Sequence, residues 1–108
     1  MLFRSLGAEC AVVTLGAAGV RWRRPGQAPC SLPALAVAPV IDTLGAGDVF
    51  HGALAVALAE GLADLPAIQF AAAAAALKCL RADGVLGAPA RAEVAQLLAA
   101  QAAANGET

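Results

Sequence analysis

The pattern of hydrophobic and polar positions predicts strands in the first part of the chain. Ala11–Leu15 is an apolar run, which predicts a strand buried on both faces, as in a parallel sheet. Val20–Arg23 alternates apolar and charged residues, which predicts a half-exposed strand. Residues 28–41 carry three prolines among apolar residues and predict extended chain with an edge strand. Residues 1–9 predict the tail of a helix that ends near Gly7.

The rest of the chain is predicted to be helical. The first helix spans about Ala46–Glu60 and closes at Gly61, a residue type common at helix C-termini. The second spans about Asp64–Arg81, with its leading aspartate as N-cap and a proline in its first turn. The third spans about Arg91–Ala103. A few strands followed by three helices indicate an α/β protein.

Composition shows a high share of hydrophobic residues and a net charge that does not favour nucleic acid as a partner. A length of 108 residues suits one domain or part of one. Hydrophobic residues make up 60% of the sequence, which is high for an ordinary domain. Either the abundant alanine reflects genome composition, or one face is built to pack on something absent from this chain. The net charge of −1 argues against a general attraction to nucleic acid.

The cysteines and the apolar runs indicate the environment. Cys10, Cys30 and Cys79 are odd in number and far apart, so we expect neither a disulfide framework nor a zinc site. Free thiols fit a reducing cytoplasm. The apolar runs Val49–Ala59 and Leu65–Leu77 are shorter than the ~18–20 residues of a membrane span, so we expect no membrane partner, and no signal peptide is expected.

The turn Asp42–Asp48 carries the candidate chemistry. Two acids flank a stretch of small residues that leads into the first predicted helix. The unpaired N–H groups and partial positive charge of a helix N-terminus favour anions, and Gly45 and Gly47 would let the backbone approach one closely. Asp48 would then stand beside a phosphate as the base for an accepting hydroxyl. There are two structural alternatives. Asp48 would then only be an acid that the helix dipole stabilises in the first turn, and Asp42 would only be a turn residue.

Three blocks of this sequence resemble the ribokinase/PfkB family of carbohydrate kinases. The run Asp-Thr-Leu-Gly-Ala-Gly-Asp-Val-Phe-His-Gly-Ala from Asp42 is similar to the family's C-terminal signature. Val13–Gly19 resembles its nucleotide-site strand and turn, and Ala75–Arg81 resembles its late helix. The resemblance implies that residues 1–108 form one partial domain, the C-terminal part of a ribokinase-like three-layer α/β/α fold.

The resemblance also implies an activity, namely phosphorylation of a sugar hydroxyl by ATP with Mg²⁺. Asp48 would be the catalytic base. The anion hole for the transferring phosphoryl group would be formed by the backbone amides of Gly45, Ala46 and Gly47, with that of Asp48. The nucleotide contacts would be Thr14, Gly16 and Gly19.

By the same analogy, a monovalent cation such as K⁺ would lie beside the anion hole. Asp42, the Leu44 carbonyl and carbonyls of residues 82–85 would hold it, because hard oxygen ligands suit such an ion. One departure is Ala72, which stands where many relatives carry Asn or His near the adenine.

The family's sugar site, lid and upstream Mg²⁺ motif precede the part seen here, so the chain resembles the last third of such a kinase. We therefore expect either a missing N-terminal half or self-association through an uncovered face of the sheet. The alternative function is a truncated, inactive fragment or interaction module.

Overall fold

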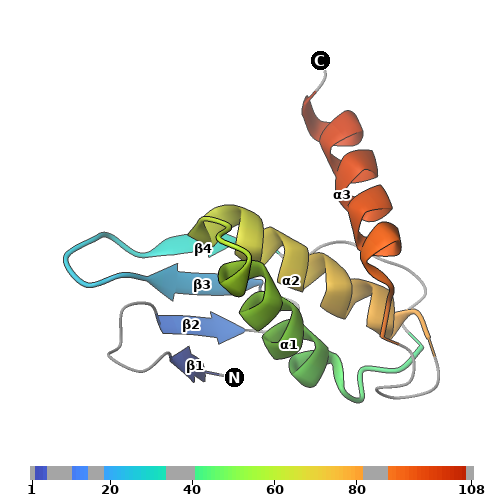
Figure 1. Cartoon of the computed structure of the whole chain (residues 1–108), viewed down its shortest axis with the longest axis horizontal. Coiled ribbons are helices and arrows are strands. Elements are labelled where there is room, and N and C mark those ends of the chain that lie inside the picture. Colours follow the sequence, from blue (N-terminus) through green and yellow to red (C-terminus); the bar gives the residue numbers. More distant parts are fainter. Residues whose placement is uncertain (1, 5–10, 15–18, 34–40, 82–87, 107–108) are drawn as a thin grey trace. The chain divides into compact units, whose positions relative to one another are not determined.

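The computed structural model describes residues 2–4, 11–14, 19–33, 41–81 and 88–106 (Figure 1). The chain divides into two compact units, Met1–Leu35 and Ala36–Thr108. The first unit contains the strands and the second contains the helices. Together they give the α/β composition expected from the sequence.

The first unit is a four-stranded antiparallel sheet in the order β1-β2-β3-β4, so each strand pairs with its neighbour in sequence (Figure 1). In the register of the sheet, Trp22 lies opposite Val12 on one side and Cys30 on the other. The strands are β1 (Leu2–Arg4), β2 (Ala11–Thr14), β3 (Val20–Arg23) and β4 (Cys30–Leu32).

Strand β3 confirms the alternating pattern, because Val20 and Trp22 are buried while Arg21 and Arg23 are exposed. Strand β4 confirms an edge strand within residues 28–41, of which residues 34–40 lie outside the described part.

Two strand-region predictions were wrong. Strand β2 exists, but it pairs antiparallel with both neighbours and only Val12 in it is fully buried. A parallel crossover needs a dozen or more residues, and the link from β2 to β3 is too short for one. The helix tail expected before Gly7 is replaced at Leu2–Arg4 by strand β1. Cross-strand pairing, with Leu2 opposite Val13, outweighs so short a local pattern.

The second unit contains α1 (Ala46–Ala59), α2 (Asp64–Cys79) and α3 (Arg91–Gly106). Helices α1 and α2 form a hairpin and lie side by side (Figure 1). The hairpin turns at Gly61, whose φ of 88° is accessible to glycine at little cost, and the Leu62 N–H donates to the Ala57 carbonyl at 3.1 Å.

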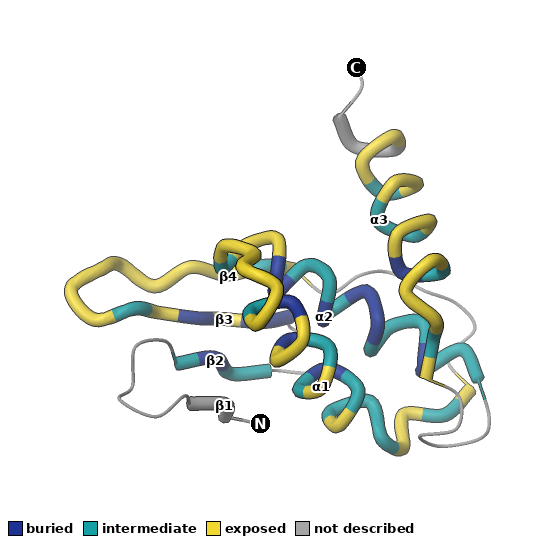
Figure 2. Tube along the Cα trace, in the orientation of Figure 1, coloured by how far each residue is buried: buried dark blue, intermediate teal, exposed yellow. Residues whose placement is uncertain are grey.

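The core of the helical unit is made of a few large side chains and many alanines. Figure 2 shows buried positions along α1 and α2. Leu54 and Ile68 are both only 1% exposed. The alanines of α2 let a neighbouring helix approach closely, since they carry no side chain beyond Cβ. The buried alanines are Ala57, Ala67, Ala71, Ala73 and Ala74.

The helix starts differ in how they are capped. Asp64 was expected to be an N-cap, but the N-cap of α2 is Ala63, which has extended backbone and no side-chain cap. Asp64 is instead the first residue of the helix, where an acid is still favoured by the helix dipole.

Helix α3 is fixed at its beginning by Glu93. One carboxylate oxygen accepts the Ala90 N–H at 2.7 Å, which is half of a capping box, and the other accepts a hydrogen bond from Arg81. Val94 is buried, whereas the described side chains after it are half-buried or exposed (Figure 2).

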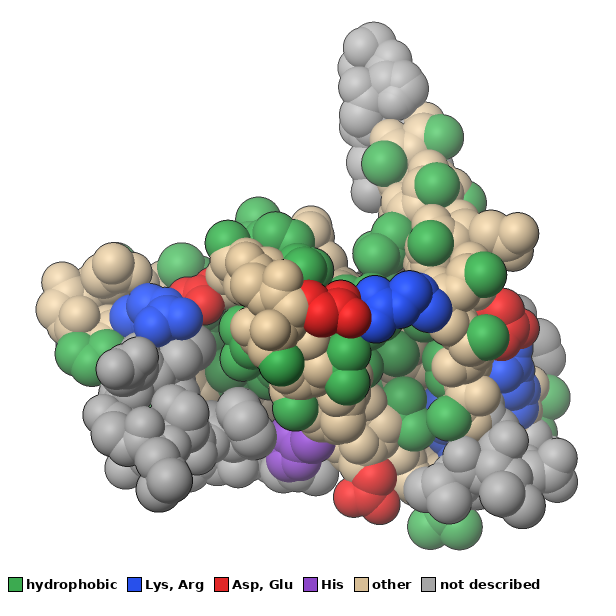
Figure 3. Space-filling view, viewed as in Figure 1, with side chains coloured by type: hydrophobic (Ala, Val, Ile, Leu, Met, Phe, Trp, Pro, Cys, Tyr) green, Lys and Arg blue, Asp and Glu red, His purple; other side chains and the backbone are tan. Residues whose placement is uncertain are grey.

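The helical unit also exposes several large hydrophobic side chains. On the face drawn in Figure 3, hydrophobic atoms are spread over α1 and α2. The self-association expected from an uncovered sheet face stays a prediction, and these helical side chains would add exposed apolar surface to it. The exposed large hydrophobic residues are Ile41, Leu44, Val56, Leu62 and Leu65.

Truncating Leu54 should test the helix core. We expect Leu54→Ala to lower the free energy of unfolding by about 2–5 kcal/mol, because it leaves a cavity in a buried site. The matched control is Leu65→Ala, the same change at a side chain that is 46% exposed, for which we expect less than about 0.5 kcal/mol. Urea unfolding followed by circular dichroism measures both, and equal losses would contradict the assignment of the core.

Glu93 should make stability depend on pH. The Ala90 N–H, and next the Arg81 guanidinium, lower the pKa of the Glu93 carboxyl below its usual value of 4.5. The folded state then binds this proton less tightly than the unfolded state. Its stabilisation is therefore present above pH 4.5 and is lost as the pH falls through the folded-state pKa. We expect Glu93→Gln to flatten the acid limb of the unfolding curve; a limb as steep as in the wild type would contradict this.

Candidate active site

The turn before α1 leaves backbone donors open at the helix N-terminus. Gly45 is the N-cap, with φ 81° in the left-handed region, and it offers no side chain to cap the helix. Its carbonyl accepts the Val49 N–H at 2.9 Å, and the Ala46 N–H is donated to the Thr43 carbonyl at 3.1 Å. Within the described ranges, the N–H groups of Gly47 and Asp48 have no acceptor. They can therefore donate to a bound anion.

Asp48 is the acid in the first turn of α1. It is exposed, so its carboxylate is accessible to a ligand from solvent. A carboxylate next to open backbone donors could act as a base beside a bound phosphate.

Asp42, at the other end of the turn, is held by its neighbours. Its Oδ1 accepts the Leu44 N–H at 2.9 Å, which closes a local turn. The N–H groups of Ile41 and Asp42 both donate to the Cys79 carbonyl, at 2.7 and 3.1 Å. The start of the turn is thus attached to the C-terminal end of α2.

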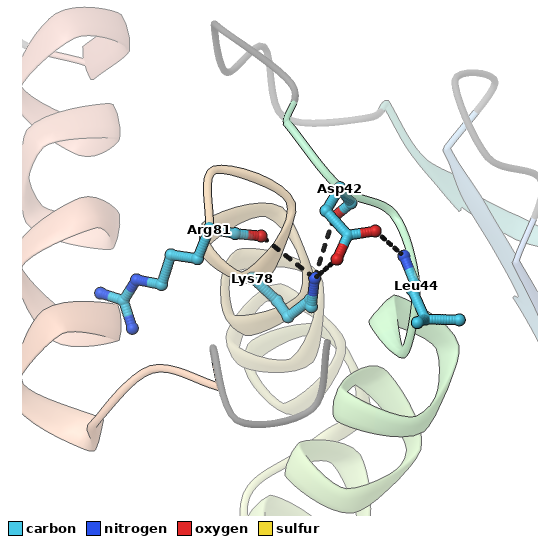
Figure 4. Close-up of polar contacts among 4 residues, drawn as sticks. All are labelled: Asp42, Leu44, Lys78 and Arg81. Atoms are coloured by element: carbon cyan, nitrogen blue, oxygen red, sulfur yellow. Dashed lines mark hydrogen bonds and ion pairs between the residues drawn. The ribbon is translucent and has the colours of Figure 1, made fainter. Parts of the chain in front are cut away.

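Lys78 makes a second connection between the turn at Asp42 and the C-terminal end of α2 (Figure 4). Its Nζ donates to the Asp42 carbonyl at 3.0 Å, to Asp42 Oδ2 at 3.3 Å and to the Arg81 carbonyl at 3.3 Å. The Lys78 side chain is completely buried, whereas that of Asp42 is 26% exposed. A buried charge is costly unless it is paired, and here the carboxylate and the C-terminal end of α2 supply the pairing.

Sequence reasoning did not assign a role to Lys78. Lys78 directly follows the apolar run Leu65–Leu77. That position was the available signal, because a single lysine inside a hydrophobic pattern must find a partner or reach solvent.

The expected nucleotide contacts belong to the first unit. Thr14 ends β2 and is half-buried, and Gly19 precedes β3 with φ 95°. Gly16 and the carbonyls of residues 82–85 lie outside the described residues. Ala72 is half-buried in α2.

The described residues offer few other sites. No three of their His, Cys, Asp or Glu side chains are grouped so as to hold a metal ion. Cys30 and Cys79 are free thiols, and Cys10 lies outside the described part. None of the helices described is both long and apolar enough to cross a membrane.

Solved structures define the fold class. The Arabidopsis thaliana ribokinase complexed with ribose and ATP has a TM-score of 0.78 and 38% identity, over 81% of this chain and 28% of its own. An Escherichia coli chain solved with ATP and Mg²⁺ has a TM-score of 0.73 and 25% identity, over 79% of this chain and 27% of its own. The chain has the fold of the corresponding part of a ribokinase.

Sequence comparison then gives the family. The family model described as pfkB family carbohydrate kinase matches residues 2–91. The ribokinase of Bacillus subtilis is 44% identical over 86 residues, which are 80% of this chain and 29% of that protein. This chain belongs to the pfkB family of carbohydrate kinases, and it spans less than a third of the length of the relatives it matches.

Proposed function

We propose that this chain is the C-terminal segment of an ATP-dependent sugar kinase that transfers the γ-phosphate of ATP to a sugar hydroxyl. The observation that carries the proposal is the exposed Asp48 carboxylate beside the open N–H groups at the start of α1. Family membership supports the reaction class, and the ribose and ATP of the Arabidopsis structure support the kinds of ligand.

The anion hole would stabilise charge on the transferring phosphoryl group. The amides of Gly47 and Asp48 are ready to donate, and Gly45 allows the backbone to come close. The Ala46 amide would join them only by releasing the Thr43 carbonyl. Preorganised donors of this kind are worth on the order of 10²–10³ in rate.

Asp48 would accept the proton of the sugar hydroxyl as its oxygen attacks the γ-phosphorus and the bond to ADP breaks. Thr14, Gly16 and Gly19 would contact the nucleotide, a role that rests on the resemblance of their strand and turn to the family's nucleotide site. Free thiols at Cys30 and Cys79 fit the reducing cytoplasm in which such an enzyme would work.

Mg²⁺ bound with the nucleotide would neutralise charge on the phosphates. Within the described residues no three acidic or metal-binding side chains are grouped, so the ion would reach this segment with the phosphates of ATP. Mg²⁺ usually binds through one or two carboxylates together with substrate phosphates.

A second candidate function is a catalytically inactive segment or interaction module. It is favoured by exposed hydrophobic side chains such as that of Leu44, which is 71% exposed. A chimera that joins this chain to the preceding region of the Bacillus subtilis ribokinase separates the two. ATP-dependent ribose phosphorylation by the chimera supports the kinase, whereas a folded but inactive chimera supports the module.

In that chimera, Asp48→Asn should lower kcat by about 10²–10⁴-fold, because the hydroxyl loses its general base. ATP affinity should change little, since the backbone donors remain. The matched control is Asp64→Asn, the same change in the first turn of α2, for which we expect near wild-type turnover. Steady-state kinetics and ATP titration measure both, and unchanged kcat in Asp48→Asn would refute the assignment of the base.

A further inference from the structure

We propose that the Lys78 ammonium takes the place of a monovalent cation at Asp42, so that the turn is held without K⁺. The resemblance to the family implies that Asp42, the Leu44 carbonyl and carbonyls of residues 82–85 bind such an ion. The residues present do not fit that expectation, because a cation covalently attached to α2 already lies against Asp42 (Figure 4).

The contacts of Lys78 are those of a bound cation. An ammonium group has three donors, and three oxygens accept from it: the carbonyl and Oδ2 of Asp42 and the carbonyl of Arg81. Two of these are neutral carbonyls and one is a carboxylate, which is the hard-oxygen environment that an alkali cation also uses. The side chain has no exposed surface, so bulk solvent does not compete for it.

Asp42 has little left to offer a second cation. Its Oδ1 accepts the Leu44 N–H, while its Oδ2 and carbonyl accept Lys78 Nζ. A potassium ion on the same carboxylate would lie next to a buried positive charge, where repulsion is screened less than in water. The negative charge that would attract the ion is already balanced.

The ammonium also lies where the helix dipole favours it. Lys78 is the basic residue in the last turn of α2, and the Arg81 carbonyl that it reaches follows that turn. Because the lysine is attached to the protein, its effective concentration at Asp42 does not depend on the ions in solution. The turn that leads to Gly45 is thereby fixed in any salt.

This inference rests on the contact between Asp42 and Lys78 and not on the phosphoryl transfer proposed above. It can therefore be tested by thermal melting of the chain itself. The result does not depend on whether the chain has kinase activity. We expect the melting temperature of the wild type to be the same in potassium chloride and choline chloride at equal ionic strength. A saturable, K⁺-specific rise in the wild type would overturn the proposal.

Removing the ammonium should create a requirement for a free ion. We expect Lys78→Met to melt about 5–10 °C lower in choline chloride, because it leaves Asp42 without its partner. Potassium or ammonium ions, but not choline, should restore part of the loss in a saturable way. Folded Lys78→Met without any such recovery would overturn the proposal.

Two further variants control for a general salt effect and for a failure of Lys78→Met to fold. Arg91→Met removes the cation of an exposed ion pair with Glu60, and potassium should not restore its stability. Recovery there equal to that in Lys78→Met would show a general salt effect and overturn the proposal. If Lys78→Met stays unfolded in both salts, Lys78→Gln replaces it in the same experiment. A saturable rise of its melting temperature with potassium supports the proposal, and no rise overturns it.

Discussion

A buried ammonium that must be paired determines how the start of α1 is held. Lys78 has no exposed surface, and the carboxylate that pairs with it belongs to a residue 36 positions earlier in the chain. Satisfying that charge brings the end of α2 and the turn before α1 together, and backbone bonds from Ile41 and Asp42 to the Cys79 carbonyl reinforce the connection. The open donors at the helix start depend on this constraint, because the turn that presents them begins at Asp42.

The two acids of the turn therefore have different physical roles. Asp42 is half-buried and occupied by internal partners, so it supports the backbone. Asp48 is exposed and lies among donors that have no acceptor in the described part of the chain, so it is available for chemistry. Gly45 lies between the two, and its left-handed conformation, which glycine adopts at little cost, turns the chain into the helix. The prediction that Asp42 is a cation ligand did not consider the Lys78 ammonium, which donates to its Oδ2, and it stays a prediction.

Local patterns predicted most of the elements well, but they missed β1 and predicted the strand partners poorly. The alternation in Val20–Arg23 and the apolar helical runs are properties of neighbouring residues, and the strand and all three helices are found close to their predicted bounds. The parallel sheet around β2 was wrong because strand direction depends on the neighbouring strands. The open donors could be inferred from the glycines before a helix, whereas the role of Lys78 depends on a contact far away in sequence.

In the proposed function, the start of α1 binds the phosphates of a nucleotide. Amide resonances in ¹⁵N–¹H spectra of the labelled chain, followed during titration with ATP and Mg²⁺, test it most directly. We expect the largest shifts in the second unit at Gly47 and Asp48, whose N–H groups are open, and small shifts at Leu65 in the first turn of α2. Unmoved Gly47 and Asp48 resonances at ATP concentrations that shift other residues of the chain would contradict the claim.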